Sequence, residues 1–339
     1  MIRFAIVGCG KIAGKHAALC NRFGKLSAVC DIDPARANEL ASQFDTKAYS
    51  SFDDLLEKQE GLTAVAICTP NGLHAEQTIK ALNRGLHVIC EKPMAITLAD
   101  AEKMNAAAEK SGKELFVIKQ NRFNPTVVKA RELLLANALG KIYSIQLNAF
   151  WHRGADYYTS SWHGDKKLDG GILFTQFSHF IDLVNWLFGD IKRVIAYERN
   201  FRREFEKEIE DTVVSCFEMN NGILGTGHFS VNSYNTNMEG SLTILAEKGT
   251  LKIGGRYLNE ISYQAMDGSE IILEKEGKKE NDYGSYQGSM SNHDKMYEHI
   301  RDVLTTGSPN HFSGRDGIRT VEMIQKIYQS AYDTGNKKN

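Results

Sequence analysis

The first 118 residues alternate short apolar runs with segments of helical periodicity, and this alternation restricts the fold more than any other feature of the chain. It is typical of a parallel sheet whose strands are joined by crossover helices. The predicted strands cover residues 2–7, 26–31, 64–68, 87–90 and 115–118. The predicted helices cover about 12–23, 34–43, 51–58, 73–84 and 98–111. We therefore expect a doubly wound α/β domain in this part of the chain.

The pattern changes after about Pro125. Helical periodicity over 126–137 is followed by longer strands of alternating apolar and polar residues. Asn221-Gly222 is a strong hairpin signal between strands at 212–219 and 223–231. This half is predicted to form a large, mostly antiparallel sheet. The remaining predictions are a helix within 169–188, a loop over 281–292, and helices near 293–305 and 315–333.

Charge and hydropathy exclude several classes of partner. The chain has 41 Lys and Arg against 42 Asp and Glu, a net charge of −1, which gives no overall field to attract nucleic acid or an anionic membrane. The apolar runs fall short of the roughly 20 residues that a membrane helix needs. The six cysteines include no C-x-x-C pair and mostly lie in or beside apolar runs, as in a reducing compartment. We expect a cytoplasmic protein with no nucleic-acid or membrane partner.

A glycine-rich turn follows the first predicted strand and opens the first predicted helix. It reads Gly8-Cys9-Gly10-Lys11-Ile12, the placement of a dinucleotide-binding motif in which the helix N-terminus supplies amide donors to a pyrophosphate. Asp31 ends the next predicted strand, about 20 residues on, where a carboxylate accepts hydrogen bonds from ribose hydroxyls. Asp31 would repel a 2′-phosphate, so NAD is favoured over NADP, with Arg36 as the residue that would reverse this preference.

Two more polar segments follow predicted strands, at the edge where a doubly wound sheet binds its ligand. They are Cys68-Thr69-Pro70-Asn71-Gly72-Leu73-His74 and Cys90-Glu91-Lys92-Pro93. With the glycine turn, they match the C-T-P-N-x-x-H and E-K-P signatures of the Gfo/Idh/MocA oxidoreductases, sugar and inositol dehydrogenases that this chain resembles over its whole length. The resemblance implies an N-terminal Rossmann domain over residues 1–120 and an α+β domain for substrate binding and association over 121–339.

The resemblance also implies roles for individual residues. Lys92 would lie beside the reacting carbon and the substrate hydroxyl, where a lysine partly buried by a cofactor transfers a proton as well as orienting the hydroxyl. Glu91 would contact the nicotinamide half of the cofactor. The full set implied to bind NAD is Gly8, Cys9, Gly10, Lys11, Ile12, Asp31, Thr69, Pro70, Asn71, His74, Glu91, Lys92 and Gln120.

The second catalytic residue is expected in segment 169–179, where many family members read G-G-G-x-x-x-D-x-G-x-H. His179 is retained here, but Thr175 stands at the Asp position. The catalytic pair predicted for this chain is therefore Lys92 with His179. On a helix, Asp182 lies one turn from His179 and is predicted to orient its imidazole.

Three further segments resemble the subgroup of this family that oxidises the 3-hydroxyl of UDP-N-acetylglucosaminuronic acid in the biosynthesis of bacterial surface sugars. They are residues 119–125, 150–153 and 157–158. Such a substrate carries a pyrophosphate and a carboxylate, which a nearly neutral protein must meet with local cations. The candidate cations are Lys119, Arg122, Arg153, Lys166 and Lys167. The residues expected to bind this substrate are Lys92, Asn121, Arg122, Arg153, Tyr158, Thr175 and His179.

Two other functions stay open. The first is a dehydrogenase of a free sugar or inositol, which the loss of the usual Asp at Thr175 argues against. The second is a regulator that binds NAD(P) without turnover, which the retention of Lys92 and His179 disfavours. The sequence also leaves open which carbon is oxidised, and whether NADH is released or is recycled in place by alpha-ketoglutarate.

No metal site is predicted, because ten residues separate His152 and His163 with no carboxylate at ligand spacing, and no H-E-x-x-H motif occurs. The charged run 200–210 is interpreted as a solvated connection between strands. The antiparallel sheet would expose a broad face unless another copy covers it. Chains resembling this one usually pair such sheets, so a homodimer or homotetramer is expected.

Overall fold

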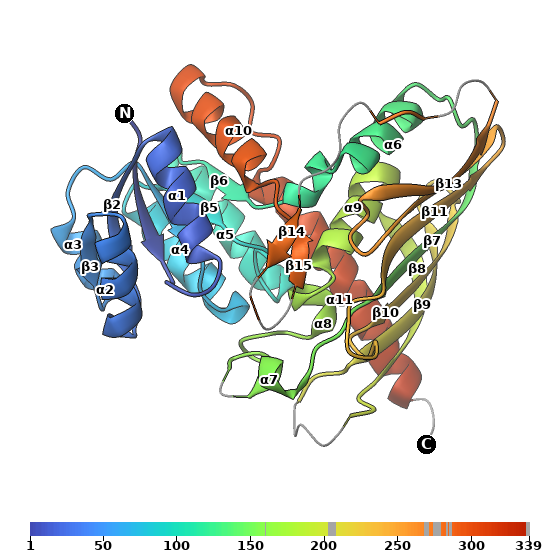
Figure 1. Cartoon of the computed structure of the whole chain (residues 1–339), viewed down its shortest axis with the longest axis horizontal. Helices are drawn as coiled ribbons and strands as arrows, with labels where there is room; N and C mark the ends of the chain where they lie inside the picture. Colours follow the sequence, from blue (N-terminus) through green and yellow to red (C-terminus); the bar gives the residue numbers. More distant parts are fainter. Residues whose placement is uncertain are drawn as a thin grey trace. The chain divides into compact units, whose positions relative to one another are not determined.

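The computed structural model describes residues 1–159, 161–202, 208–267, 271–273, 279–282, 284 and 287–336. The chain divides into two compact units (Figure 1). The first contains residues 1–119 and 293–321, and the second contains 120–292 and 322–339. The expected division near residue 120 therefore has a counterpart near residue 293, where the chain returns to the first unit. Assigning all of 121–339 to one domain missed this return.

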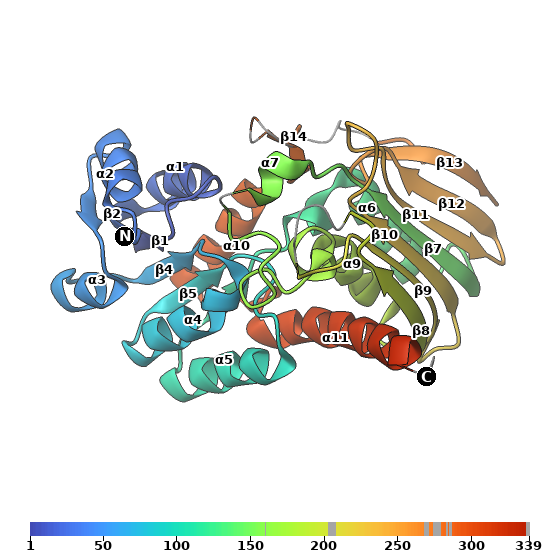
Figure 2. The same ribbon diagram turned by 90° about the horizontal axis from the view of Figure 1, so that it is seen from below.

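The first unit is built on a six-stranded parallel sheet (Figure 2). Its strands are β1 (Arg3–Val7), β2 (Lys25–Cys30), β3 (Lys47–Tyr49), β4 (Ala64–Ile67), β5 (His87–Cys90) and β6 (Leu115–Val117). Their order is β3-β2-β1-β4-β5-β6, which reverses direction between β1 and β4 as in a Rossmann fold. The predicted doubly wound sheet is confirmed, and the short strand β3 is an addition that the sequence did not reveal.

Helices connect these strands. They are α1 (Ala13–Phe23), α2 (Pro34–Gln43), α3 (Phe52–Lys58), the short 3₁₀ turn η1 (Asn71–Leu73), α4 (His74–Asn83) and α5 (Leu98–Ser111). Two of them begin where the sequence predicts. The Asp33 side chain accepts a hydrogen bond from the Ala35 N–H with Pro34 in the first turn, and Thr97 accepts one from the Asp100 N–H. Such caps satisfy amide donors that a helix leaves unpaired at its start.

A segment from the far end of the chain completes the first unit. Helix α10 (His293–Thr306) packs against α1, and its Tyr297 is fully buried, 6.0 Å from the Phe4 ring and 6.3 Å from the Phe23 ring. After α10, the chain adds an edge contact to the parallel sheet, because the Val117 N–H donates to the Phe312 carbonyl at 2.8 Å. Helix α11 (Gly314–Asn336) then runs from the first unit into the second.

The second unit contains a seven-stranded sheet. Its strands are β7 (Ile142–Phe150), β8 (Ile191–Arg199), β9 (Thr212–Met219), β10 (Leu224–Ser230), β11 (Glu239–Ala246), β12 (Gly249–Gly254) and β13 (Glu260–Met266), in the order β13-β12-β11-β7-β10-β9-β8. Neighbouring strands run antiparallel except for β7 and β10, which are parallel. The hairpin predicted at Asn221-Gly222 is confirmed, with Gly222 at a φ of +84°. The large, mostly antiparallel sheet is therefore present.

Helices α9 and α11 lie on one face of this sheet (Figures 1 and 2). The helices of the unit are the 3₁₀ turn η2 (Gln120–Phe123), α6 (Pro125–Leu135), α7 (Ala155–Tyr158), α8 (Ile172–Thr175) and α9 (Ser178–Phe188). Side chains alternate between buried and exposed along β9 and β10, so the covered face forms the core around Phe177, Phe180 and Phe229. The segment 281–292, predicted to be a loop, instead includes β15 (Gln287–Met290), which pairs with β14 (Glu280–Asp282).

The charged run 200–210 is only partly solvated. Residues 203–207 lie outside the described part, but Glu210 is partly buried and its Oε1 accepts hydrogen bonds from Tyr328 Oη at 2.5 Å and from the Ile172 N–H at 2.9 Å. Burial raises the pKa of the Glu210 carboxyl to about 7. Within the described residues, no helix is both long and apolar enough to cross a membrane.

Candidate active site

The glycine turn connects β1 to α1 in a conformation that requires glycine at its first position. Gly8 has a φ of +89°, and a Cβ there would lie 2.6 Å from the carbonyl oxygen of Cys68, at the end of β4. A Cβ on Gly10 would instead meet no atom within 4 Å. The turn, which continues through Lys11 and Ile12, is thus tight against the sheet at Gly8 and open at Gly10, as the approach of a pyrophosphate requires.

Asp31 lies beside this turn, at the end of β2. Its Oδ2 accepts a hydrogen bond from the Cys9 N–H at 2.7 Å, and its Oδ1 accepts one from the Asp33 N–H at 2.9 Å. The backbone therefore fixes the carboxylate where the sequence predicts a ribose-binding acid. Arg36, the residue considered for a 2′-phosphate, is exposed and pairs with Asp33 at 3.3 Å.

His74 holds together the two segments that follow β4 and β5. The imidazole is 1% exposed, with Nε2 2.8 Å from the Thr69 carbonyl oxygen and Nδ1 2.8 Å from the Pro93 carbonyl oxygen. Burial lowers the pKa of His74, so the ring is neutral and donates to one of the two carbonyls. His74 thus connects the backbone of Thr69 to that of Pro93, and its predicted contact with the cofactor stays a prediction.

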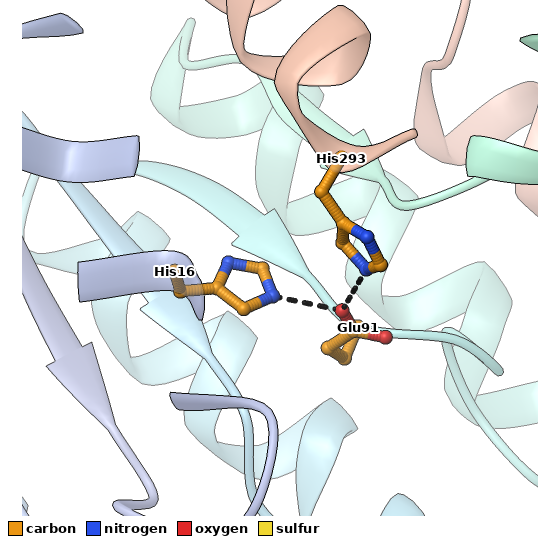
Figure 3. Close-up of side chains that lie close together, drawn as sticks. All are labelled: His16, Glu91 and His293. Carbon is orange, nitrogen blue, oxygen red and sulfur yellow. Dashed lines mark hydrogen bonds and ion pairs between the residues drawn. The ribbon is translucent and has the colours of Figure 1, made fainter. Parts of the chain in front are cut away.

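The E-K-P segment follows β5. The carboxylate of Glu91 faces inward, toward His16 of α1 and His293 of α10, rather than along the surface (Figure 3). Burial by itself raises the pKa of Glu91, but hydrogen bonds from the two histidines outweigh it and hold this pKa well below its usual range. The other Glu91 oxygen, Oε2, accepts a hydrogen bond from the backbone N–H of Lys92 at 3.1 Å.

His179 lies in the first turn of α9, in the second unit, and is 5% exposed. Its Nε2 is 3.2 Å from the side-chain nitrogen of Gln120, which also donates to Ser289 Oγ at 3.1 Å. An amide can donate to a neutral imidazole and, when turned over, accept from an imidazolium. Gln120 is therefore a suitable partner for a histidine that gains and loses a proton.

Thr175, at the position where many relatives have Asp, hydrogen-bonds to a carboxylate from elsewhere. Its Oγ1 lies 2.5 Å from Oδ1 of Asp169, which is fully buried and also accepts from the backbone N–H of Gly164 and Gly171. Asp169 was not among the predicted site residues. Its place before two glycines, six residues ahead of Thr175, is the signal that would have indicated it.

Asp182 and Arg122 form a buried ion pair that the sequence did not predict. Oδ2 and Oδ1 of Asp182 accept from Nε and Nη2 of Arg122, each at 2.8 Å, and both side chains are buried. The guanidinium also lies 5.1 Å from the centre of the Trp186 ring. A bidentate pair of this kind satisfies both charges internally. Asp182 and Arg122 are therefore paired in the interior of the second unit. The orientation of His179 by Asp182 and the binding of substrate by Arg122 stay predictions.

The other predicted cations are also in varied environments. Lys119 is 4% exposed and forms a 2.6 Å ion pair with Asp316 inside the first unit. Arg153 is buried in the second unit, with its guanidinium over the rings of Trp151 and Tyr157. Lys166 and Lys167 lie on the surface. The expected cluster of five cations is therefore not a single basic patch.

Several buried polar atoms of the second unit have no hydrogen-bond partner among the described residues. They are both amide atoms of Asn121, Oε1 of Gln120, Oε1 of Gln176 and Oγ of Ser178. Asn121 is only 2% exposed, and an unpaired buried amide costs about 1–3 kcal/mol. The Tyr158 phenol, elsewhere in the second unit, stays protonated because burial raises its pKa. Such atoms suit the hydroxyl and amide groups of a polar ligand.

The fold and these residues define an NAD-binding oxidoreductase whose second unit is built on a large, mostly antiparallel sheet. Residues 2–119 match the description "Oxidoreductase family, NAD-binding Rossmann fold", and residues 127–252 match the "GFO/IDH/MocA C-terminal domain". The chain belongs to the Gfo/Idh/MocA family. The Gly8 turn, open at Gly10 and flanked by Asp31, fits a dinucleotide.

Two solved structures are similar over nearly the whole chain. The WlbA dehydrogenase from Bordetella pertussis, in complex with NADH and UDP-GlcNAcA, is 32% identical with a TM-score of 0.90, covering 98% of this chain and 97% of that one. The WlbA dehydrogenase from Chromobacterium violaceum, with the same two molecules, is 34% identical with a TM-score of 0.89, covering 98% and 94%.

Two curated relatives of about 30% identity match over a shorter part. A 1-carboxy-3-chloro-3,4-dihydroxycyclohexa-1,5-diene dehydrogenase from Comamonas testosteroni is 30% identical over 235 residues, which are 68% of this chain and 58% of that protein. A glucose-6-phosphate 3-dehydrogenase from Bacillus subtilis is 31% identical over 56% of this chain and 54% of its own length. The chain thus aligns with little more than half the length of these two proteins.

Proposed function

We propose that this chain oxidises the 3-hydroxyl of UDP-N-acetylglucosaminuronic acid to a ketone, with NAD as the hydride acceptor. The observation that carries the proposal is the likeness to two WlbA dehydrogenases whose structures contain NADH and UDP-GlcNAcA, at 32% and 34% identity over 98% of this chain. The buried amides of Asn121 and Gln176 support it, because a nucleotide sugar acid offers many polar groups to pair with them. We place the reaction in the cytoplasm, in the biosynthesis of bacterial surface polysaccharide.

The proposed mechanism divides the work between the two units. NAD, when bound, supplies the acceptor for the hydride that leaves the sugar carbon. The Lys92 ammonium group orients the hydroxyl oxygen and stabilises negative charge on it. His179 takes the hydroxyl proton at its imidazole, and the amide of Gln120 follows the change in protonation. Thr175, whose hydroxyl hydrogen points to Asp169, presents oxygen lone pairs that can accept from a substrate N–H or O–H group.

The test is mass spectrometry of the sugar after incubation with the protein, NAD and alpha-ketoglutarate. Alpha-ketoglutarate is included so that turnover is detected even if NADH is recycled in place. We expect a product two hydrogens lighter than UDP-N-acetylglucosaminuronic acid, absent with Lys92→Ala. An unchanged sugar, despite NAD binding measured in parallel, would contradict the proposal. Glucose, myo-inositol and their phosphates tested in the same way would then show whether the alternative dehydrogenase or the silent regulator is correct.

NAD recognition gives a further expected result. Asp31→Asn should weaken NAD binding by about 10- to 100-fold, because hydrogen bonds to a charged carboxylate contribute about 1.5–3 kcal/mol. Asparagine keeps an oxygen for the Cys9 N–H, so the glycine turn should persist. Calorimetric titration with NAD and NADP measures both affinities. Glu39→Gln, an exposed acid on α2, is the matched control, and equal NAD affinity in the two variants would show that Asp31 does not bind the ribose.

We also propose that the chain forms a homodimer or homotetramer through the uncovered face of its large sheet. The apolar face is formed by Ile195 and Tyr197 of β8, Val214 of β9 and Leu224 of β10, whose side chains are 63%, 52%, 41% and 59% exposed. The strand register places them on the same side of the sheet. Exposed apolar clusters of this kind mark association surfaces.

Ile195→Asp should therefore shift the protein toward monomers, because the charge would be buried at the interface between two copies. Size-exclusion chromatography with light scattering measures the mass at several concentrations. Leu135→Asp, at a 71% exposed position at the end of α6, is the matched control and should leave the mass unchanged. A wild-type protein that is already monomeric would disprove the proposed association.

A further inference from the structure

Three buried side chains from distant parts of the sequence meet in the first unit (Figure 3). His16 is on α1, just after the glycine turn, Glu91 follows β5, and His293 is the first residue of α10. Nε2 of His16 lies 2.8 Å and Nε2 of His293 lies 3.4 Å from the same oxygen, Oε1 of Glu91. The histidines are 0% and 2% exposed and Glu91 is 8% exposed. We call these three residues the Glu91 cluster.

The distance between His16 and Glu91 fits a hydrogen bond better than the spacing of two ligands of one metal ion. Two atoms that bind one zinc ion tetrahedrally at about 2.0 Å are about 3.3 Å apart. The His16 to Glu91 distance of 2.8 Å is that of a hydrogen bond with a proton between the atoms. The second nitrogen of His16, Nδ1, is also occupied, by Tyr297 Oη at 2.8 Å. The imidazole of His16 therefore connects Tyr297 to the carboxylate.

Charge in the Glu91 cluster is arranged so that the carboxylate stays ionised. The pKa of Glu91 is held well below its usual range by the two histidines despite burial. Burial lowers the pKa of His293, so this ring is neutral near pH 7 and offers an N–H to the carboxylate. A buried carboxylate depends on such donors, because it has lost its contact with water. Loss of either donor should therefore loosen the position of Glu91.

The fixed carboxylate of Glu91 also restrains the backbone of Lys92. Oε1 of Glu91 contacts the Nε2 atoms of the two imidazoles. Oε2 accepts a hydrogen bond from the backbone N–H of Lys92 at 3.1 Å. A hydrogen bond from a peptide N–H to an ionised carboxylate is stronger than one between neutral groups. The peptide that carries the Lys92 side chain is thus fixed from inside the unit, by residues that belong to α1 and α10.

We propose that His16 and His293 are positioning residues for Lys92, acting through Glu91, and that Glu91 does not itself bind the nicotinamide half of the cofactor. This inference rests on the proposed function of Lys92 as a residue of the reacting site. It predicts that disturbing the Glu91 cluster lowers the rate of oxidation and leaves the affinity for NAD unchanged. If Glu91 contacted the cofactor, disturbing the cluster would instead weaken the binding of NAD.

A matched pair of variants tests the proposal. His293→Gln places an amide N–H near the position of Nε2, whereas the shorter side chain of His293→Asn withdraws it. We expect His293→Asn to reduce kcat by about 10- to 100-fold, with KM for the sugar and Kd for NAD within about threefold of the wild type. His293→Gln should keep at least about a third of the wild-type kcat. His16→Asn and His16→Gln provide a second pair at the other donor.

A second readout does not depend on the substrate. Acetylation of Lys92 by a small amine reagent, followed by peptide mass spectrometry, reports the environment of its amine in the NAD-bound protein. We expect the rate for Lys92 to change by about threefold or more in His293→Asn but not in His293→Gln, while exposed Lys110 on α5 reacts at the same rate in all variants. This result would support the inference even if the wild type leaves UDP-N-acetylglucosaminuronic acid unchanged, which would contradict only the proposed function.

Two outcomes would overturn the inference. Weaker NAD binding in His293→Asn, by about tenfold or more at unchanged Lys92 reactivity, would show that the Glu91 cluster serves the cofactor directly. Equal losses in the Asn and Gln variants would show that the imidazole acts through packing rather than by donating to Glu91.

Discussion

Lys92→Met is expected to lower kcat for oxidation of UDP-N-acetylglucosaminuronic acid by about 10²- to 10⁴-fold, the range that a positioned acid or base contributes. Methionine keeps most of the length and apolar surface of lysine but carries no exchangeable proton. His179→Gln should cause a loss of similar size, because glutamine can still contact Gln120 but cannot take up a proton. Rapid-mixing measurements of NADH formation give the single-turnover rates.

The controls for this result separate chemistry from folding and binding. Lys110→Met removes an exposed lysine of the same unit and should leave kcat unchanged. The affinity of Lys92→Met for NAD should stay within about tenfold of the wild type. The double variant of Lys92 and His179 should be little slower than either single one, since the effects of residues that act together on one hydroxyl group are not additive. A Lys92→Met enzyme that keeps full activity would remove Lys92 from the mechanism.

Glu210 should make the second unit less stable as the pH rises. Its pKa is about 7 in the folded protein against an ordinary value of 4.5, because burial and the nearby Glu198 disfavour its charge. Below about pH 4.5 the group is neutral in both states. Between about 4.5 and 7 the unfolded chain releases the proton first, so stability falls with rising pH, by about 3 kcal/mol in total. Glu210→Gln stays neutral and should not show this loss.

Urea unfolding at pH 5.5 and pH 8.0 measures this effect. All three tryptophans, Trp151, Trp162 and Trp186, belong to the second unit, so their fluorescence reports the unit that contains Glu210. Relative to the wild type, Glu210→Gln should gain about 2 kcal/mol in unfolding free energy between the two pH values. Glu208→Gln, at an exposed acid two residues away, should gain nothing. Parallel pH dependence in the wild type and Glu210→Gln would contradict the raised pKa.

The sequence predicted the first unit well because its structure depends on local patterns. Buried strands such as β4 are continuous apolar runs, and the helix starts at Asp33 and Thr97 have capping residues that act over two and three positions. The three-residue strand β3 lacks such a signal, since it contains no run of β-branched residues. Strand β15 was likewise hidden in a polar segment of Gly, Ser and Gln.

The differences at the site arise from contacts between residues far apart in sequence. Asp182 lies one turn from His179 on α9, which suggested a pair, but Arg122 reaches it from a distance of 60 residues with better charge complementarity. Glu210 belongs to a charged run, and its burial depends on hydrogen bonds from Ile172, 38 residues away, and Tyr328, 118 residues away. The local sequence around a side chain does not show which distant residue will contact it in the folded protein.

The return of the chain at His293 has a consequence for protein synthesis. Because Tyr297 and His293 fill the interior beside α1, a ribosome that has produced only residues 1–119 has released a parallel sheet with an open flank. The N-terminal unit therefore cannot finish folding in the order in which it is translated. It must wait, partly assembled, until almost the whole polypeptide has emerged, and chaperones have time to engage it during that interval.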